Sequence, residues 1–457
     1  MLNNEQSNAL EIADKYMQQS ASMESRGFSE ADIFHHVSTQ AREVERVAVK
    51  VKTVDGAKNY QGTIKRLSDP IWWKKQIRVR NLREKEDAHI KNGHVNKKHP
   101  YASNEAVYIL RERRKQNKKL LENSIAENDQ GERFTLQELA ETSMANPENR
   151  RSELMTVANG LERYAEQYKH NALFITVTAP SKYHKVSRKY AGFTPKQTNQ
   201  YLQKQWAKVR AFLKRHGAEY YGLRVSEPHK DGTPHAHYLI FCDKQDDDIV
   251  RTAFIEYALE HDSDEVGASF NRIKVERLPA GTATAYLAKY VSKNIDGFGI
   301  QSGEQMSLDG MQPIDHAERV KAWASTWGIR QFQRIGKHPI GIWRELRRLS
   351  TELQANSKFA KYKWLLWAVD NADYFAYLIE MDKLGNEISI TRDLEEWKEN
   401  RFGERVQGVI RGVQLGLEFV ETRFREWILK INEIKNEADE ALKGFFKNPW
   451  TCVNNCT

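Results

Sequence analysis

The most constraining feature of this sequence is the alternation of short apolar runs with longer amphipathic segments between residues 172 and 294. Runs rich in β-branched and aromatic residues are typical of strands, and apolar residues three and four apart are typical of helices. The expected strands are 173–179, 220–227, 235–242 and 270–278, and the expected helices are 194–217, 246–261 and 281–294. The resulting order, βαββαβα, predicts an α+β fold with a ferredoxin-like (split βαβ) antiparallel sheet, in which the first and third strands are central.

Two histidines lie on the third expected strand, separated by one residue. Side chains alternate between the two faces of a strand, so His235 and His237 point to the same side. The step Asp231-Gly232 favours a tight turn, and this turn brings Glu227 alongside the histidines. Two imidazoles and one carboxylate leave positions open for water or substrate, as a catalytic metal requires. The pattern predicts a divalent metal site suited to Mg²⁺ or Mn²⁺; unrelated surface histidines and a lysine-paired glutamate are the alternative.

The expected helix 281–294 carries two tyrosines and two lysines on one face. Tyr286 and Tyr290 are four residues apart, and Lys289 and Lys293 each follow a tyrosine by three residues. At about 100° per residue, all four fall within a stripe about 100° wide. A phenol with its ordinary pKa of about 10 is a weak nucleophile, but nearby cations and a metal-bound phosphate favour its ionised form. The helix therefore predicts attack on a phosphodiester; a plain amphipathic helix with solvated lysines is the alternative.

The composition favours a polyanionic partner. Lys and Arg number 71 against 62 Asp and Glu, which gives a net charge of +9, and this surplus does not distinguish DNA from RNA or an anionic membrane. The three cysteines, Cys242, Cys452 and Cys456, favour a reducing compartment over a disulfide scaffold. The start of the sequence lacks the pattern of a signal peptide, and no apolar run reaches the roughly 20 residues that span a bilayer. We therefore expect a cytoplasmic protein with no membrane partner.

Four motifs, in this order, resemble those of the HUH endonucleases, and in more detail those of the gene A replication initiators of temperate tailed bacteriophages. They are LFITVTAPSKYH at 173–184, RVSEPHKDGTPHAHYLIF at 224–241, AYLAKYVSK at 285–293 and WGIRQFQRIG at 327–336. The segment DPIWWKKQIR at 69–78 also resembles the family, so the resemblance covers roughly residues 65 to 350. The family's histidine pair normally encloses a bulky hydrophobe, whereas Ala236 stands there in this chain.

The resemblance implies a role for each of these positions. The glutamate and both histidines bind a divalent cation, the two tyrosines are paired nucleophiles, and the two lysines contact the phosphate. The implied function is a site- and strand-specific DNA endonuclease and strand transferase that starts and ends rolling-circle replication through a 5′-phosphotyrosine and a free 3′-hydroxyl. The implied partner is single-stranded or supercoiled origin DNA in the cytoplasm of a bacterial host. A host helicase, a single-strand binding protein and DNA polymerase are further hypotheses.

We expect four parts along the chain. They are a mainly helical, basic N-terminal region (1–168), an HUH endonuclease domain (169–300), a helical basic and aromatic extension (301–352), and a C-terminal α+β module of unknown role (353–457), with a charged helix near 418–440. In the extension, arginines alternate with tryptophan and phenylalanine, a composition typical of a groove for single-stranded DNA. The candidate DNA-contact residues are Arg330, Arg334, Arg344 and Arg347.

Three other interpretations stay open at this point. A relaxase or single-strand transposase of the same superfamily would use the same chemistry, a non-catalytic origin-binding protein would keep only the fold, and a metal-dependent phosphohydrolase would attack with water. Two tyrosines on adjacent helical turns favour replication initiation, because both can reach one metal centre and exchange strands there.

Overall fold

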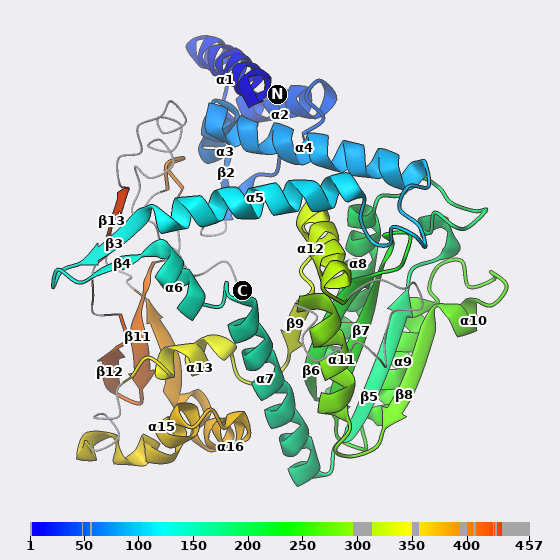
Figure 1. Ribbon diagram of the computed structural model, residues 1–457, viewed down its shortest axis with the longest axis vertical. Helices are drawn as coiled ribbons and strands as arrows, with labels where there is room; N and C mark the ends of the chain where they lie inside the picture. Colours follow the sequence, from blue (N-terminus) through cyan, green and yellow to red (C-terminus); the bar gives the residue numbers. More distant parts are fainter. Residues whose placement is uncertain are drawn as a thin grey trace. The chain divides into compact units, whose positions relative to one another are not determined.

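The computed structural model describes residues 2–47, 49–54, 57–295, 313–349, 356–392, 400–404, 408–423, 425 and 427–431. It is an α+β structure (Figure 1) whose described strand pairings are antiparallel. The chain divides into two compact units, one of residues 1–86 with 392–410 and one of residues 87–391 with 411–457. Residues 432–457 of the expected C-terminal module, with Cys452 and Cys456, lie outside the described residues.

The first unit is a small helical assembly around a buried tryptophan. Its elements are α1 (Leu2–Ser25), α2 (Glu30–Glu43), β1 (Lys52–Val54), β2 (Ala57–Asn59), α3 (Tyr60–Leu67) and the first part of α4 (Pro70–Lys91). Trp73 is fully buried, stacks on Tyr16 with 5.5 Å between ring centroids, and donates its indole N–H to the Leu67 carbonyl at 2.6 Å. Arg66 pairs with Glu404, so residues from both ends of this unit's sequence meet in one core.

A five-stranded antiparallel sheet forms the core of the second unit. Its strands are β5 (Asn171–Thr178), β6 (Tyr220–Pro228), β7 (Pro234–Cys242), β8 (Ile273–Leu278) and β9 (Phe332–Ile335). They are ordered β8–β5–β7–β6–β9, so β5 and β7 each have a neighbour on both sides. The first four lie where the sequence predicts strands. The fifth lies within the extension expected to be helical, and its four residues pair with β6, a partner that local periodicity does not reveal.

One face of this sheet is covered by two helices. They are α8 (Pro195–Arg215) and α9 (Asp247–Ala258), which follow β5 and β7 in the chain. Trp206 of α8 and Phe254 of α9 stack with 5.6 Å between ring centroids inside the core on this face. Helix α8 begins where the sequence predicts, because Thr194 caps its first turn in a capping box and proline follows at the first helical position.

The opposite face carries the helix with the two tyrosines. Helices α7 (Pro147–Tyr168) and α11 (Ala283–Ile295) pack on each other and on this face, in a core that includes Phe174, Leu239 and Leu287. Figure 1 shows α11 beside the strands β5 to β7. The sheet therefore separates the face covered by α8 and α9 from the face on which the predicted histidines and tyrosines lie.

The remaining elements belong mainly to the second unit and include two smaller sheets, β13–β3–β4 and β10–β11–β12. These elements are α5 (Asn104–Glu122), β3 (Ser124–Asn128), β4 (Arg133–Thr135), α6 (Leu136–Thr142), η1 (Ser181–Tyr183), α10 (Ala268–Asn271), α12 (Pro313–Trp327), α13 (Ile340–Leu346), η2 (Ser357–Tyr362), α15 (Lys363–Asp370), α16 (Tyr374–Leu384), η3 (Gly385–Glu387), β10 (Ile388–Arg392), β11 (Ile410–Leu415), β12 (Glu418–Glu421) and β13 (Trp427–Ile431).

The prediction of a charged helix near 418–440 is wrong for the described residues. Strands β12 and β13 occupy this part of the chain, and β13 pairs with β3, about 300 residues earlier in the sequence. Pairing with so distant a strand outweighs the local pattern, which is the usual reason why short strands escape prediction. In the part of the chain that the structure describes, we find no helix with the length and apolar character needed to cross a membrane.

Candidate active site

The hairpin of β6 and β7 holds two histidines against a carboxylate. Glu227 lies directly opposite His235 in the strand register, as the predicted turn requires. In that turn Gly232 adopts a left-handed conformation with φ of 83° and donates its N–H to the His229 carbonyl at 2.8 Å. Oε2 of Glu227 is 3.4 Å from Nε2 of His237 and 3.9 Å from Nε2 of His235. One ligand atom from each of the three residues lies within 4.8 Å of the others, so the predicted metal-binding residues meet at one point.

Hydrogen bonds and burial prepare these residues for a cation. Oγ1 of Thr176 is 3.0 Å from Nδ1 of His237, which leaves Nε2 to face Glu227. Burial holds the pKa of His235 well below its ordinary value, so its imidazole is neutral at pH 7. Burial also opposes the ionisation of Glu227, but the hydrogen bond from His237 and other favourable contacts outweigh it and lower the pKa of Glu227 to about 2. Two imidazole nitrogens and one carboxylate oxygen converging on one point fit a divalent cation.

Helix α11 is fixed at its N-terminus by a residue of α7. The buried carboxylate of Glu162 accepts the backbone N–H of Ala283 at 2.6 Å and that of Thr284 at 3.1 Å. These N–H groups have no partner within their own helix, and a carboxylate satisfies both their hydrogen bonds and the helix dipole. Leu287 and Val291 are buried on the other side of the helix, as the sequence predicts. Together these contacts set the position of the helix over the sheet.

Both tyrosines of α11 lie over β5, and Tyr290 also contacts β7, the strand that carries the histidines. The Tyr290 ring is 4.5 Å from the His237 ring, measured between centroids. Phe174 of β5 lies beneath the helix, 4.6 Å from the Tyr286 ring and 5.3 Å from the Tyr290 ring. The two phenol rings are 6.3 Å apart. The phenols and the Glu/His/His group therefore share one side of the sheet, and the Tyr290 ring contacts that group directly.

The surroundings of the phenols favour the protonated form. Burial raises the pKa of Tyr290, and the charge of Glu227 raises it further. Burial also raises the pKa of Tyr286, although 37% of this side chain is exposed. Nζ of Lys293 is 3.8 Å from Oε2 of Glu227, whereas Lys289 is exposed on the helix surface. A cation at the carboxylate would offset the negative charge that opposes ionisation of Tyr290.

Asn294 and Thr176 contact the candidate metal ligands and were not predicted from the sequence. Asn294 is fully buried, donates from its side-chain amide to Glu227, and donates to the Tyr290 carbonyl at 2.7 Å. It therefore links the carboxylate to the helix that carries the tyrosines. The only sequence signal was a polar residue one turn after Tyr290, on a helix side that packs against the sheet.

Replacing Asn294 by leucine is expected to weaken the binding of Mn²⁺ about 10- to 100-fold, because groups that orient metal ligands contribute this much to affinity. Isothermal titration of the purified protein with MnCl₂ measures the change. Asn371→Leu is the matched control, because Asn371 donates to the Trp367 carbonyl at 2.9 Å one helical turn back, as Asn294 does, without touching a metal-site residue. Equal Mn²⁺ affinity in the two variants would contradict the role given to Asn294.

The four candidate DNA-contact arginines lie in different surroundings. Arg330 and Arg347 are exposed. Arg344 donates to both carboxylate oxygens of Glu153, at 2.8 and 2.5 Å, so its charge is already paired. Burial of Arg334 lowers its pKa to about 10. The tryptophans of the same segment are buried core residues, namely Trp323, Trp327 and Trp343.

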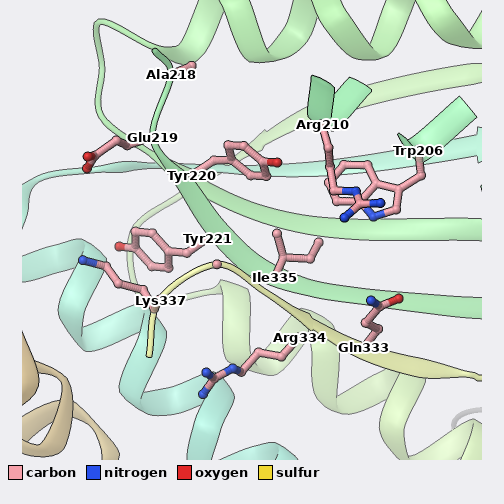
Figure 2. A pocket seen from close by; sticks show the side chains of 11 residues that line it. Trp206, Arg210, Ala218, Glu219, Tyr220, Tyr221, Gln333, Arg334, Ile335 and Lys337 are labelled. Carbon is pink, nitrogen blue, oxygen red and sulfur yellow. The ribbon is translucent and has the colours of Figure 1, made fainter. Parts of the chain in front are cut away.

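A pocket of about 510 Å³ lies at the other end of the sheet. It is lined by residues of α8, by the start of β6 and by β9, and Figure 2 shows Arg210 lying along the Trp206 ring there. Tyr220 and Tyr221 in this pocket begin β6, and Glu227 lies near the other end of that strand. The pocket is therefore separated from the Glu/His/His group by the length of β6 and does not belong to that site.

Comparison with known proteins identifies relatives along most of the chain. The replication protein of Haemophilus phage HP1 is 37% identical over 421 residues, which are 88% of this chain and 54% of that protein. The replication gene A protein of Escherichia phage P2 is 35% identical over 420 residues, which are 86% of this chain and 55% of that protein. A probable replication endonuclease from a prophage-like region of Salmonella typhimurium is 36% identical over 267 residues, 56% of this chain and 33% of that protein.

The chain spans about half the length of the first of these relatives. No solved structure matches it. The family model described as bacteriophage replication gene A protein (GPA) matches residues 6–298, a range that contains the Glu/His/His group and both tyrosines of α11. The chain therefore belongs to the bacteriophage replication gene A protein family.

Proposed function

We propose that this chain is a metal-dependent tyrosine DNA endonuclease with DNA-joining activity that starts and ends rolling-circle replication. The observation that carries the proposal is the packing of Tyr290 against His237, with 4.5 Å between the ring centroids. His237 is one of the three residues of the Glu/His/His group. Such a group beside two phenols suits attack on a phosphodiester by a side chain. The names of the relatives, replication gene A protein and probable replication endonuclease, point the same way.

We also propose that β5 to β8 form a ferredoxin-like core of the HUH type. Numbered in chain order, these strands lie in the sheet as 4-1-3-2, with all neighbours antiparallel, and this order supports a split βαβ arrangement. In this arrangement the metal-binding hairpin is strands two and three, and the helix with the nucleophiles follows strand four. Strand β9 extends the sheet at the β6 edge.

The side chains have distinct parts in the proposed reaction. Glu227, His235 and His237 would hold Mg²⁺ or Mn²⁺, which when bound polarises the scissile phosphate. Lys293 would donate to a phosphate oxygen as a point charge. One tyrosine oxygen forms a bond to phosphorus while the bond from phosphorus to the 3′ oxygen breaks, which leaves a 5′-phosphotyrosine and a 3′-hydroxyl. Because one ester replaces another, a 3′-hydroxyl can later attack the phosphotyrosine and reseal the strand without ATP.

The spacing of the tyrosines suits two successive cleavages. With 6.3 Å between their rings, the second phenol can meet a regenerated origin while the first still carries DNA. The proposed substrate is single-stranded or supercoiled origin DNA in the cytoplasm of a bacterial host. A host helicase, a single-strand binding protein and DNA polymerase are the proposed partners that extend the 3′-hydroxyl.

Two basic loops contact the proposed metal-binding hairpin, and their positive charges could bind the phosphates of a DNA backbone. In the loop before α5, Tyr101 donates its backbone N–H to the Lys230 carbonyl at 3.2 Å, and Lys97 and Lys98 are exposed. In the loop after β5, the Tyr183 carbonyl accepts the Thr233 hydroxyl at 3.3 Å, and the same loop exposes a further cation, Arg188. We propose that these cations contact phosphates on either side of the scissile bond.

The triple change Lys97→Ala, Lys98→Ala, Arg188→Ala is expected to weaken DNA binding and to reduce its salt dependence. The plot of log affinity against log salt concentration has a negative slope, and each lost phosphate contact makes it less steep by about 0.7 for a single strand. Loss of all three contacts therefore reduces the steepness by about 2. Fluorescence anisotropy with a labelled single-stranded oligonucleotide at several salt concentrations measures the slope. The control removes three exposed cations from the opposite end of the sheet, Lys214→Ala, Arg215→Ala and Lys244→Ala. The same loss of slope in both variants would refute the proposed loop contacts.

A covalent-capture experiment tests the proposed function. The protein is incubated with Mn²⁺ and a random-sequence single-stranded DNA library labelled at its 3′ end, and the products are run on a denaturing gel. We expect label to migrate with the 53.1 kDa chain until protease is added, because the 5′-phosphotyrosine stays on the labelled fragment. Cut DNA without an adduct would indicate attack by water, and bound but uncut DNA would indicate a non-catalytic origin-binding protein.

A further inference from the structure

Glu276 of β8 faces the same side of the sheet as the metal-binding residues. In the strand register it lies opposite Phe174, the residue on which both tyrosine rings pack. Its Oε2 accepts a hydrogen bond from the Tyr286 hydroxyl at 3.3 Å, and its Oε1 is held by Nζ of Lys274 at 2.6 Å. One carboxylate oxygen is therefore fixed by an ion pair, and the other is directed at a phenol.

This contact makes the two tyrosines chemically different. Among the described residues, the Tyr290 hydroxyl has no hydrogen-bond partner, whereas the Tyr286 hydroxyl already donates to a carboxylate. A phenol must lose its proton as its oxygen bonds to phosphorus. A proton acceptor within hydrogen-bonding distance typically accelerates such a step 10²- to 10⁴-fold.

We propose that Glu276 is the catalytic proton acceptor for Tyr286 and has no such part in attack by Tyr290. The inference rests on the proposed function. As the Tyr286 oxygen forms its bond to phosphorus, the phenolic proton passes to Oε2 of Glu276, the bond from phosphorus to the 3′ oxygen breaks, and solvent water protonates that oxygen. In resealing, a 3′-hydroxyl attacks the phosphotyrosine, loses its proton to solvent, and Glu276 returns a proton to the departing phenol.

The test uses variants in which only one tyrosine can react. In Tyr290→Phe, where Tyr286 is the remaining nucleophile, adding Glu276→Gln is expected to slow adduct formation on single-stranded DNA about 100-fold or more. Glutamine can still accept the phenolic hydrogen bond but not the proton. In Tyr286→Phe, the same change is expected to leave the rate unaltered. Glu256→Gln is the matched control in the Tyr290→Phe background, because it makes the same change at an exposed carboxylate of α9, on the other face of the sheet, so the rate should not fall.

A second readout does not depend on cleavage. Because the Glu276 carboxylate opposes ionisation of Tyr286, Glu276→Gln is expected to lower the pKa of this phenol in the metal-free protein, as followed by ultraviolet difference titration against Tyr286→Phe. An equal slowing in both single-tyrosine backgrounds, or no slowing in Tyr290→Phe, would overturn the role of Glu276 while leaving the proposed function in place. Absence of adduct from every variant, including the unmodified protein, would overturn the proposed function and this inference with it.

Discussion

Simultaneous replacement of Tyr286 and Tyr290 by phenylalanine is expected to abolish the covalent protein–DNA adduct, whereas each single replacement retains it. Both rings lie on Phe174, and the Tyr290 ring packs against His237, so both phenols lie on the side of the sheet where we propose that the phosphate binds. Phenylalanine keeps the ring and its packing and removes only the nucleophilic oxygen. Denaturing gels with 3′-labelled single-stranded DNA measure the adduct in the four proteins.

The control for this experiment is the double change Tyr108→Phe, Tyr168→Phe. These two tyrosines are 63% and 47% exposed and lie on α5 and α7, outside the group around His237. The control should form as much adduct as the unmodified protein, and circular dichroism should be the same for all variants. Adduct that persists in the Tyr286→Phe, Tyr290→Phe protein would mean that another side chain is the nucleophile, and the proposed mechanism would fail.

His237→Ala is expected to eliminate Mn²⁺ binding and to reduce adduct formation roughly a thousandfold, because a bound metal contributes several kcal/mol to stabilising charge on a phosphoryl group and each 1.36 kcal/mol is tenfold in rate. Isothermal titration measures the first effect and single-turnover gels the second. In the unmodified protein, saturating Mn²⁺ should also raise the thermal midpoint, because a ligand that binds only the folded state stabilises it. That rise should disappear in the variant.

His216→Ala provides the matched histidine control. His216 is the C-cap residue of α8, at the opposite end of the sheet from the hairpin. It is exposed and hydrogen-bonds the Phe212 carbonyl at 2.9 Å. It should bind Mn²⁺ as the unmodified protein does. The same Mn²⁺ affinity in His237→Ala and in the control would exclude the Glu/His/His group as the metal site, even if the protein cleaved DNA.

The correct sequence predictions rest on short-range geometry. Because side chains alternate along a strand, His235 and His237 lie on the same face of the sheet. Because of the helical repeat, Tyr286 and Tyr290 lie on the same side of their helix. The wrong predictions concern strands that depend on long-range pairing. Strand β9 and strand β13 are four and five residues long and are stabilised by partners far away in the chain, β6 and β3. A local pattern of charged residues could not reveal such partners.

The amino-acid sequence by itself determined which reactive side chains share a face, because residues two apart on a strand and four apart on a helix are related by fixed backbone geometry. Only the tertiary structure decided which groups surround them. Thr176 lies 61 residues before His237, and Glu162 lies 121 residues before the helix end that it caps. Such contacts depend on strand register and on how an apolar helix face docks to the sheet. The free energy that fixes this docking comes from apolar surface buried throughout the unit, and no single position in the sequence encodes it.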